Sequence, residues 1–149
     1  MGVWGAGNFD NDWARDWIGD LLEQNNPVIV RDALNQAIHW SKPLNSSFIR
    51  RIITRQSAEP YLIARVASKA LAAAEVVACW LGHSNPKLPE GIAEWSNKNS
   101  KAFSPEYVQL ARQAIIVIKT KSELKDLWEE GDASEWYQVI QDLDRRLQN

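Results

Sequence analysis

The chain has 149 residues, of which 45% are hydrophobic, a size and composition that fit one domain around a single core. Its longest apolar stretch, Ala70–Leu81, contains Glu75 and is too short to cross a bilayer. The lone Cys79 excludes an internal disulfide, and the N-terminus has no basic region followed by an apolar run. We therefore expect a cytoplasmic protein, and one cysteine with two histidines leaves too few ligands for a zinc site.

The formal net charge of −2 hides an uneven distribution. Residues 1–40 carry six acidic and two basic side chains, whereas residues 41–72 carry one acidic and six basic side chains. Polarised charge of this kind favours oriented encounters with charged partners.

The apolar spacing is helical along nearly the whole chain, and no stretch alternates as a strand would. We predict one all-α domain over residues 1–149, a compact bundle of six or seven helices. The opening segment is rich in glycine and tryptophan. Glycine is costly to order, but aromatic side chains such as Trp4 and Phe9 bring enough apolar area to hold this segment against the body.

Start and stop signals divide the chain into helices. Asp10 is the expected cap of the first helix, and Gly82 the expected end of the longest one. The predicted helices are Asn11–Gln24, a second from Asn26 to a stop at Pro43, a short third after Asn45 or Ser46, Ala58–Leu81, one opened by Ser104 and Pro105, one capped by Ser122, and a last one after Asp132. The irregular region His83–Phe103 has room for a further short helix at Ile92–Trp95.

Two expectations concern the C-terminal helices. Ser122 caps a helix whose Leu124, Leu127 and Trp128 should face inward, and Asp132 with Glu135 has the spacing of a capping box.

Three blocks of the sequence, in the same order, resemble a known family. They are the opening Met1–Trp17, the central Ala70–Ala78 and the late Ser122–Trp128, and they resemble the bacterial family filed as domain of unknown function 4259. The resemblance implies a small helical bacterial protein of the cytoplasm with no assigned activity, and it brings no catalytic residue. The segment Pro43–Arg55 matches the pattern least well and could be an insertion with its own role.

Acidic side chains recur along one edge of the first predicted helix. Asp12, Asp16, Asp20 and Glu23 follow at spacings of four, four and three residues, which places them on one face. A charged face is commonly plain solvated surface. Like charges four residues apart are nevertheless mildly unfavourable, by a few tenths of a kcal/mol, roughly, so the same stripe also fits a contact with a cationic partner.

A basic helix offers an alternative. Arg50, Arg51 and Arg55 could contact phosphates, which is the minimum footprint of a nucleic-acid-binding protein. The acidic balance of the whole chain argues against strong binding of that kind.

Glu75 stands among small apolar residues on the longest predicted helix, so its carboxylate should be buried and in need of a partner. A tryptophan ring nitrogen, a glycine-loop amide or an arginine would serve. A role as general acid would need a second titratable group nearby, and none is evident in the sequence. Cys79 fits a core position, and among the eight tryptophans Trp95 is the best candidate for exposure.

The pair Gly5 and Gly7 has part of the spacing of a phosphate-binding loop, but no strand precedes it and the third glycine of a dinucleotide fingerprint is missing. With no catalytic set and no cofactor or metal motif, we expect a non-enzymatic interaction protein, monomeric or weakly dimeric. The leading hypothesis is an immunity protein that neutralises a basic toxin through Asp12, Asp16, Asp20 and Glu23. A nucleic-acid-binding accessory protein and an enzyme of unrecognised type remain the alternatives.

Overall fold

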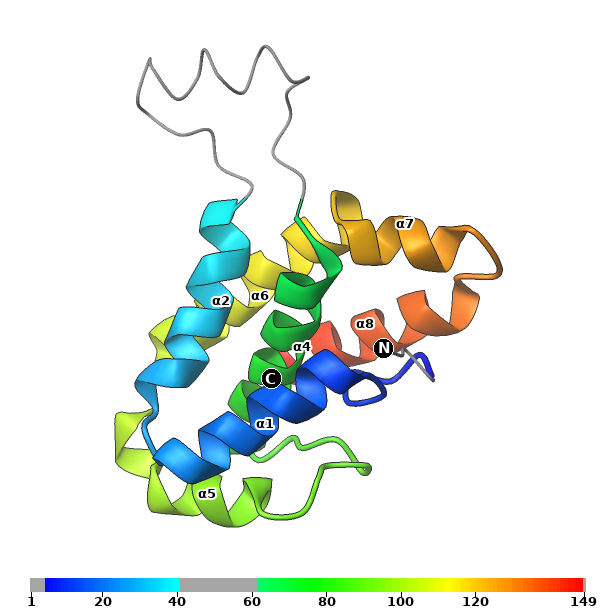
Figure 1. The fold of residues 1–149 in the computed structure, drawn as a ribbon. Coiled ribbons are helices and arrows are strands. Elements are labelled where there is room, and N and C mark those ends of the chain that lie inside the picture. Colours follow the sequence, from blue (N-terminus) through cyan, green and yellow to red (C-terminus); the bar gives the residue numbers. More distant parts are fainter. Residues whose placement is uncertain (1–4, 41–61, 149) are drawn as a thin grey trace, which may run out of the picture.

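In the computed structural model, the described residues are 5–40 and 62–148 (Figure 1). They form seven α-helices and one short 3₁₀ helix, so the all-α prediction is confirmed. The elements are α1 (Asp12–Gln24), α2 (Val28–Trp40), α4 (Ala64–Trp80), α5 (Ile92–Lys98), η1 (Ser100–Ala102), α6 (Pro105–Thr120), α7 (Glu123–Glu129) and α8 (Ser134–Gln148). The predicted helix after Asn45 lies outside the described residues.

Helix α4 is the centre of the bundle, and α1, α2, α6 and α8 all pack against it. Nearly every side chain from Ala64 to Ala78 is buried, because the alanines of this helix let its neighbours approach closely from several sides. The apolar stripes predicted for α1 and α2 face this core, including Trp17, Leu21 and Leu34.

Two helix starts differ from the sequence prediction. Asn11, not Asp10, caps α1: its side-chain oxygen accepts a hydrogen bond of 2.8 Å from the amide of Ala14. Helix α4 begins at Ala64 rather than Ala58, since Ile63 is extended and Leu62 forms an isolated bridge with Ser122.

The late start of α4 follows from a contact with the beginning of α7. The amide of Glu123 donates to the carbonyl of Leu62 at 2.7 Å, and the Glu123 carboxylate accepts from the amide of Ala64 at 2.7 Å. A carboxylate at a helix N-terminus satisfies an orphan amide and complements the helix dipole. Glu123 thus caps α4 from a distant part of the chain.

The other end of α4 is closed as predicted. Gly82 has a φ of +85°, a conformation that glycine adopts without strain. The Gly82 amide donates to the carbonyl of Cys79 at 3.0 Å. The following amide, that of His83, donates to the carbonyl of Ala78 at 2.9 Å. These two bonds make a Schellman motif.

Three expectations on exposure were wrong. Trp95 is only 4% exposed, because its ring packs 5.6 Å from that of Trp80 in a cluster that includes Phe103 and Tyr107. Leu127 is 46% exposed on the outer side of α7, and Cys79 is half-buried rather than part of the core. Among the described residues, no helix combines the length and apolar character needed to span a membrane.

Candidate functional site

The glycine-rich opening forms a tight loop around the carboxylate of Asp10. Asp10 accepts a hydrogen bond of 3.0 Å from the amide of Gly7, while its own amide donates to the Gly7 carbonyl at 3.0 Å. A Cβ atom at Gly5 or Gly7 would lie 2.7 or 2.6 Å from the Asp10 carboxylate oxygen. A side chain at either glycine would have to push the Asp10 carboxylate aside, and in this loop a side chain of the protein fills the space that a phosphate would take.

This loop is fastened to the body at two further points. Phe9 is buried in the core, and its carbonyl accepts a hydrogen bond of 3.0 Å from Nε of Arg15. The side chain of Asn8 is also buried and donates to Glu75 at 2.8 Å. The expected packing of the opening segment is thus seen for residues 5–11, whereas Trp4 lies outside the described residues.

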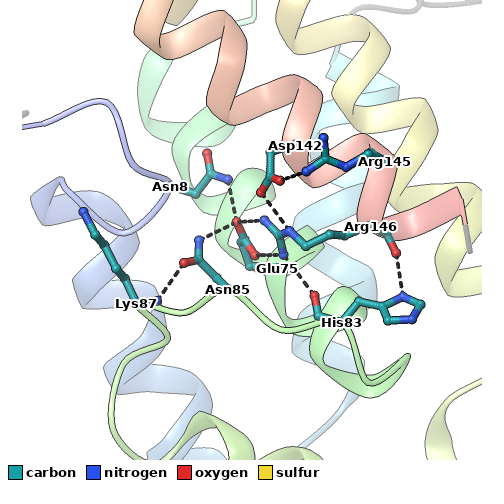
Figure 2. A network of polar contacts seen from close by, with 8 residues as sticks. All are labelled: Asn8, Glu75, His83, Asn85, Lys87, Asp142, Arg145 and Arg146. Carbon is teal, nitrogen blue, oxygen red and sulfur yellow. Dashed lines mark hydrogen bonds and ion pairs between the residues drawn. The ribbon is translucent and has the colours of Figure 1, made fainter.

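Glu75 is the centre of a buried polar cluster, shown in Figure 2. Its side chain is fully buried, and both carboxylate oxygens accept hydrogen bonds from Arg146, at 2.8 and 3.0 Å. One of these oxygens also accepts from the amides of Asn8, at 2.8 Å, and Asn85, at 3.0 Å. The cluster joins four parts of the chain: the N-terminal loop, α4, the segment after α4, and α8.

Arg146 is held on its other sides as well. Its Nε donates to Asp142 at 2.9 Å, and its Nη1 donates to the carbonyl of His83 at 3.1 Å. The His83 ring nitrogen Nδ1 lies 2.9 Å from the Arg146 carbonyl, which can only accept, so Nδ1 carries the proton. Burial lowers the pKa of Arg146, but hydrogen bonds and charge from Glu75 and Asp142 more than offset it and raise the pKa above its usual value.

Among the partners predicted for Glu75, the structure shows an arginine, Arg146. The other acid of the cluster, Asp142, binds Arg146. Every described donor to Glu75 is an amide or a guanidinium. This arrangement favours the structural interpretation of Glu75 over that of a general acid.

The outer face of α1 carries the predicted acidic stripe. Asp16, Asp20 and Glu23 are exposed, and none of them forms an ion pair with a residue that the structure describes. Asp12 is half-buried in the first turn, where a carboxylate complements the helix dipole. The stripe thus presents three exposed carboxylates over about two turns of helix.

Gly19 lies among these carboxylates. A Cβ atom added to it would meet nothing within 4 Å, and its backbone is helical. Glycine within a helix costs about 1 kcal/mol relative to alanine. The fold therefore does not require Gly19, which leaves the backbone of α1 open to close approach from outside.

Other sequence-based candidates are not placed. Arg50, Arg51 and Arg55 lie outside the described residues. Within residues 5–40 and 62–148, no group of three or more histidine, cysteine, aspartate or glutamate side chains is arranged to hold a metal ion.

The sequence reasoning missed an open groove of about 390 Å³ beside the Glu75 cluster. One side is α8, with Glu135, Gln138, Val139 and Asp142, and the other is formed by Gly7 and residues 85–87. The only sequence signal for this groove was the three- and four-residue spacing of Glu135, Val139 and Asp142, which puts them on one face of α8.

Comparison with known proteins gives a family. The model of a family described as Domain of unknown function (DUF4259) matches residues 2–43 and 41–139. The chain belongs to this family. No curated protein and no solved structure matches it.

The three blocks that carry the DUF4259 resemblance correspond to defined parts of the structure. The opening block contains the Asp10 loop, the central block is the part of α4 that carries Glu75, and the late block is α7 with its cap. The second matched range includes Pro43–Arg55, the segment suggested as an insertion, whereas Arg146 lies after the matched residues.

Proposed function

We propose that this DUF4259 protein is a non-enzymatic interaction protein of the bacterial cytoplasm, which binds a basic protein through the outer face of α1. The observation that carries the proposal is the combination of three exposed carboxylates, Asp16, Asp20 and Glu23, that form no ion pair with a described residue, and a helical glycine that the fold does not need. A toxin that this protein neutralises is the partner class we favour.

Charge supports a basic partner. Repulsion between carboxylates four residues apart on a helix is relieved when a cationic surface docks against them. Complementary charge also speeds association and makes it sensitive to salt.

The open backbone at Gly19 supports a close contact. Packed helices ordinarily lie about 8–10 Å apart, depending on the side chains between them. A position without a side chain lets a helix or a bulky side chain of the partner approach the backbone of α1 directly. Asp16, Asp20 and Glu23 would then surround the point of closest approach.

Affinity purification from the source cell, with the whole chain as bait, tests the proposal. We expect one basic protein at stoichiometric amounts, lost when Asp16, Asp20 and Glu23 are all replaced by lysine, and weakened by Gly19→Leu. The matched control reverses three carboxylates on other elements, Asp32, Glu94 and Glu130, and should retain the partner.

Three results would contradict the proposal: no stoichiometric partner, equal loss of the partner with both triple variants, or salt-dependent binding to nucleic acid in a filter assay without a protein partner. The last result would favour the basic segment Arg50–Arg55 instead.

A further inference from the structure

We infer that the groove between α8 and residues 85–87 receives a long cationic side chain, lysine or arginine, from the same partner. This inference rests on the proposed function and adds a second contact to it. The groove, of about 390 Å³, has the volume of a small binding pocket.

The walls of the groove are fixed by the Glu75 cluster. Asn85 donates to Glu75 at 3.0 Å and accepts from the amide of Lys87 at 2.8 Å, which holds the 85–87 turn. Asp142 is held by Arg145 and Arg146, and Gly7 by Asp10. A groove whose walls are already ordered loses little conformational entropy when a ligand binds.

The α8 wall has the polarity of a site for a long cationic side chain. Val139 is half-buried in the middle of this wall, and Pro86 lies across from it. The methylene stem of a lysine or arginine packs on apolar surface of this kind while its charged head stays near water. Glu135 lies one turn before Val139, is exposed, and forms no ion pair with a described residue. Its carboxylate can therefore accept the cationic head.

Lys87 sets the direction in which the side chain enters. Its own side chain extends away from Glu75 on the opposite wall (Figure 2), where it forms no ion pair with a described residue. Its ammonium repels a cationic head on that side and so directs the head toward Glu135.

The groove also borders the loop that leads into α1. Gly7 is part of the groove lining and precedes Asp12, the first residue of α1, by five positions in a loop that doubles back on Asp10. One basic partner that spans this loop would therefore contact α1 and place a side chain in the groove.

A nitrogen-15 NMR titration of the full chain with a synthetic peptide of lysine, arginine and alanine tests the inference. We expect saturable shifts of the backbone amides of Asn85, Gln138 and Val139, together with those of α1. Shifts confined to α1 would overturn the inference and leave the proposed function standing. Shifts confined to the groove would support cation binding there, but they would contradict docking on the α1 face and so the idea of one shared partner. Shifts at neither place would contradict both proposals.

Two charge reversals should change the affinity of the groove for the peptide in opposite directions. Glu135→Lys should weaken peptide binding at the groove about fivefold or more, and Lys87→Glu should strengthen it by a similar factor, since each reverses one charge beside the bound cation. The control, Glu94→Lys on α5, should leave the groove affinity within about twofold. Equal effects of Glu135→Lys and Glu94→Lys would overturn the inference, because only long-range charge would then be acting.

Discussion

Arg146 binds both carboxylate oxygens of Glu75 across 71 residues of sequence, and in doing so it ties the last helix to the central one. Glu75 is fully buried and the Arg146 side chain is only 13% exposed, so water is a poor substitute for either partner. Removing one partner leaves the other charge buried and uncompensated, which is more costly than the pair itself is stabilising.

Replacing Glu75 by leucine should therefore lower the free energy of unfolding by about 3–5 kcal/mol, the range seen when one member of a buried ion pair is removed. Arg146→Met should have a similar effect. The double variant should lose clearly less than the sum of the two, since it removes both charges together. Urea unfolding followed by tryptophan fluorescence measures all three.

The exposed pair of Glu94 and Lys98, 3.3 Å apart on α5, is the matched control. Glu94→Leu should change the free energy of unfolding by no more than about 0.5 kcal/mol. If the Glu75 and Arg146 effects simply add, the two side chains do not act as a pair.

The local sequence predicted most of the helices, because their signals lie within a few residues of one another. The apolar stripes of α1 and α2 and the closing Gly82 follow from spacing and backbone preference alone. The start of α4 was not predictable in this way, since Leu62 is held out of the helix by Glu123, which is distant in sequence. The exposure of Trp95 was predicted wrongly for a similar reason: its ring packs against Trp80, which lies on another helix.

Two glycine-to-alanine changes should have opposite effects on stability. At Gly7 the added methyl group would lie 2.6 Å from the Asp10 carboxylate, so Gly7→Ala must displace that side chain and break its hydrogen bond. We expect a loss of about 1–3 kcal/mol. At Gly19 nothing lies within 4 Å, so Gly19→Ala should raise the free energy of unfolding by about 0.5–1 kcal/mol. Thermal unfolding of both variants measures the difference.

A double variant tests whether the clash with Asp10 causes the loss of stability in Gly7→Ala. If the clash with Asp10 is the cause, adding Asp10→Ala to Gly7→Ala should cost little further, because the hydrogen bond is already lost. Independent losses from the two changes would show that Gly7 matters for another reason.

The carboxylate of Glu123 should stabilise the start of α4. Glu123→Ala leaves the amide of Ala64 without its acceptor at 2.7 Å, and the loss of a helix cap costs about 0.5–2 kcal/mol. Hydrogen exchange should show the effect first at the amides of α4 nearest Ala64, while those near Gly82 stay protected. Uniform loss of protection along α4 would argue against a capping role.

The candidate site divides into a part that sequence reasoning could find and a part that it could not. The acidic stripe of α1 is local, and helical spacing was enough to find it. The need of Glu75 for a partner was predictable from its apolar neighbours, but choosing Arg146 among the basic residues required the packing of α8 on α4. The groove arises only when the N-terminal loop, residues 85–87 and α8 meet.

The stability of the folded protein at acidic pH should depend in part on Glu129. Hydrogen bonds from Lys125 and from the Tyr137 hydroxyl, at 2.6 and 2.8 Å, lower the pKa of Glu129 below its usual value of 4.5. A carboxyl group whose pKa is lower in the folded protein stabilises it above the unfolded pKa, and this contribution is lost as the pH falls through the folded pKa. Carbon-detected NMR of the glutamate side chains should therefore show Glu129 titrating below 4.5. Lys125→Ala removes the stronger of the two hydrogen bonds and should bring the Glu129 midpoint back toward 4.5, and Tyr137→Phe should do so to a smaller degree. An unchanged midpoint in Lys125→Ala would mean that the ion pair with Glu129 does not persist in solution.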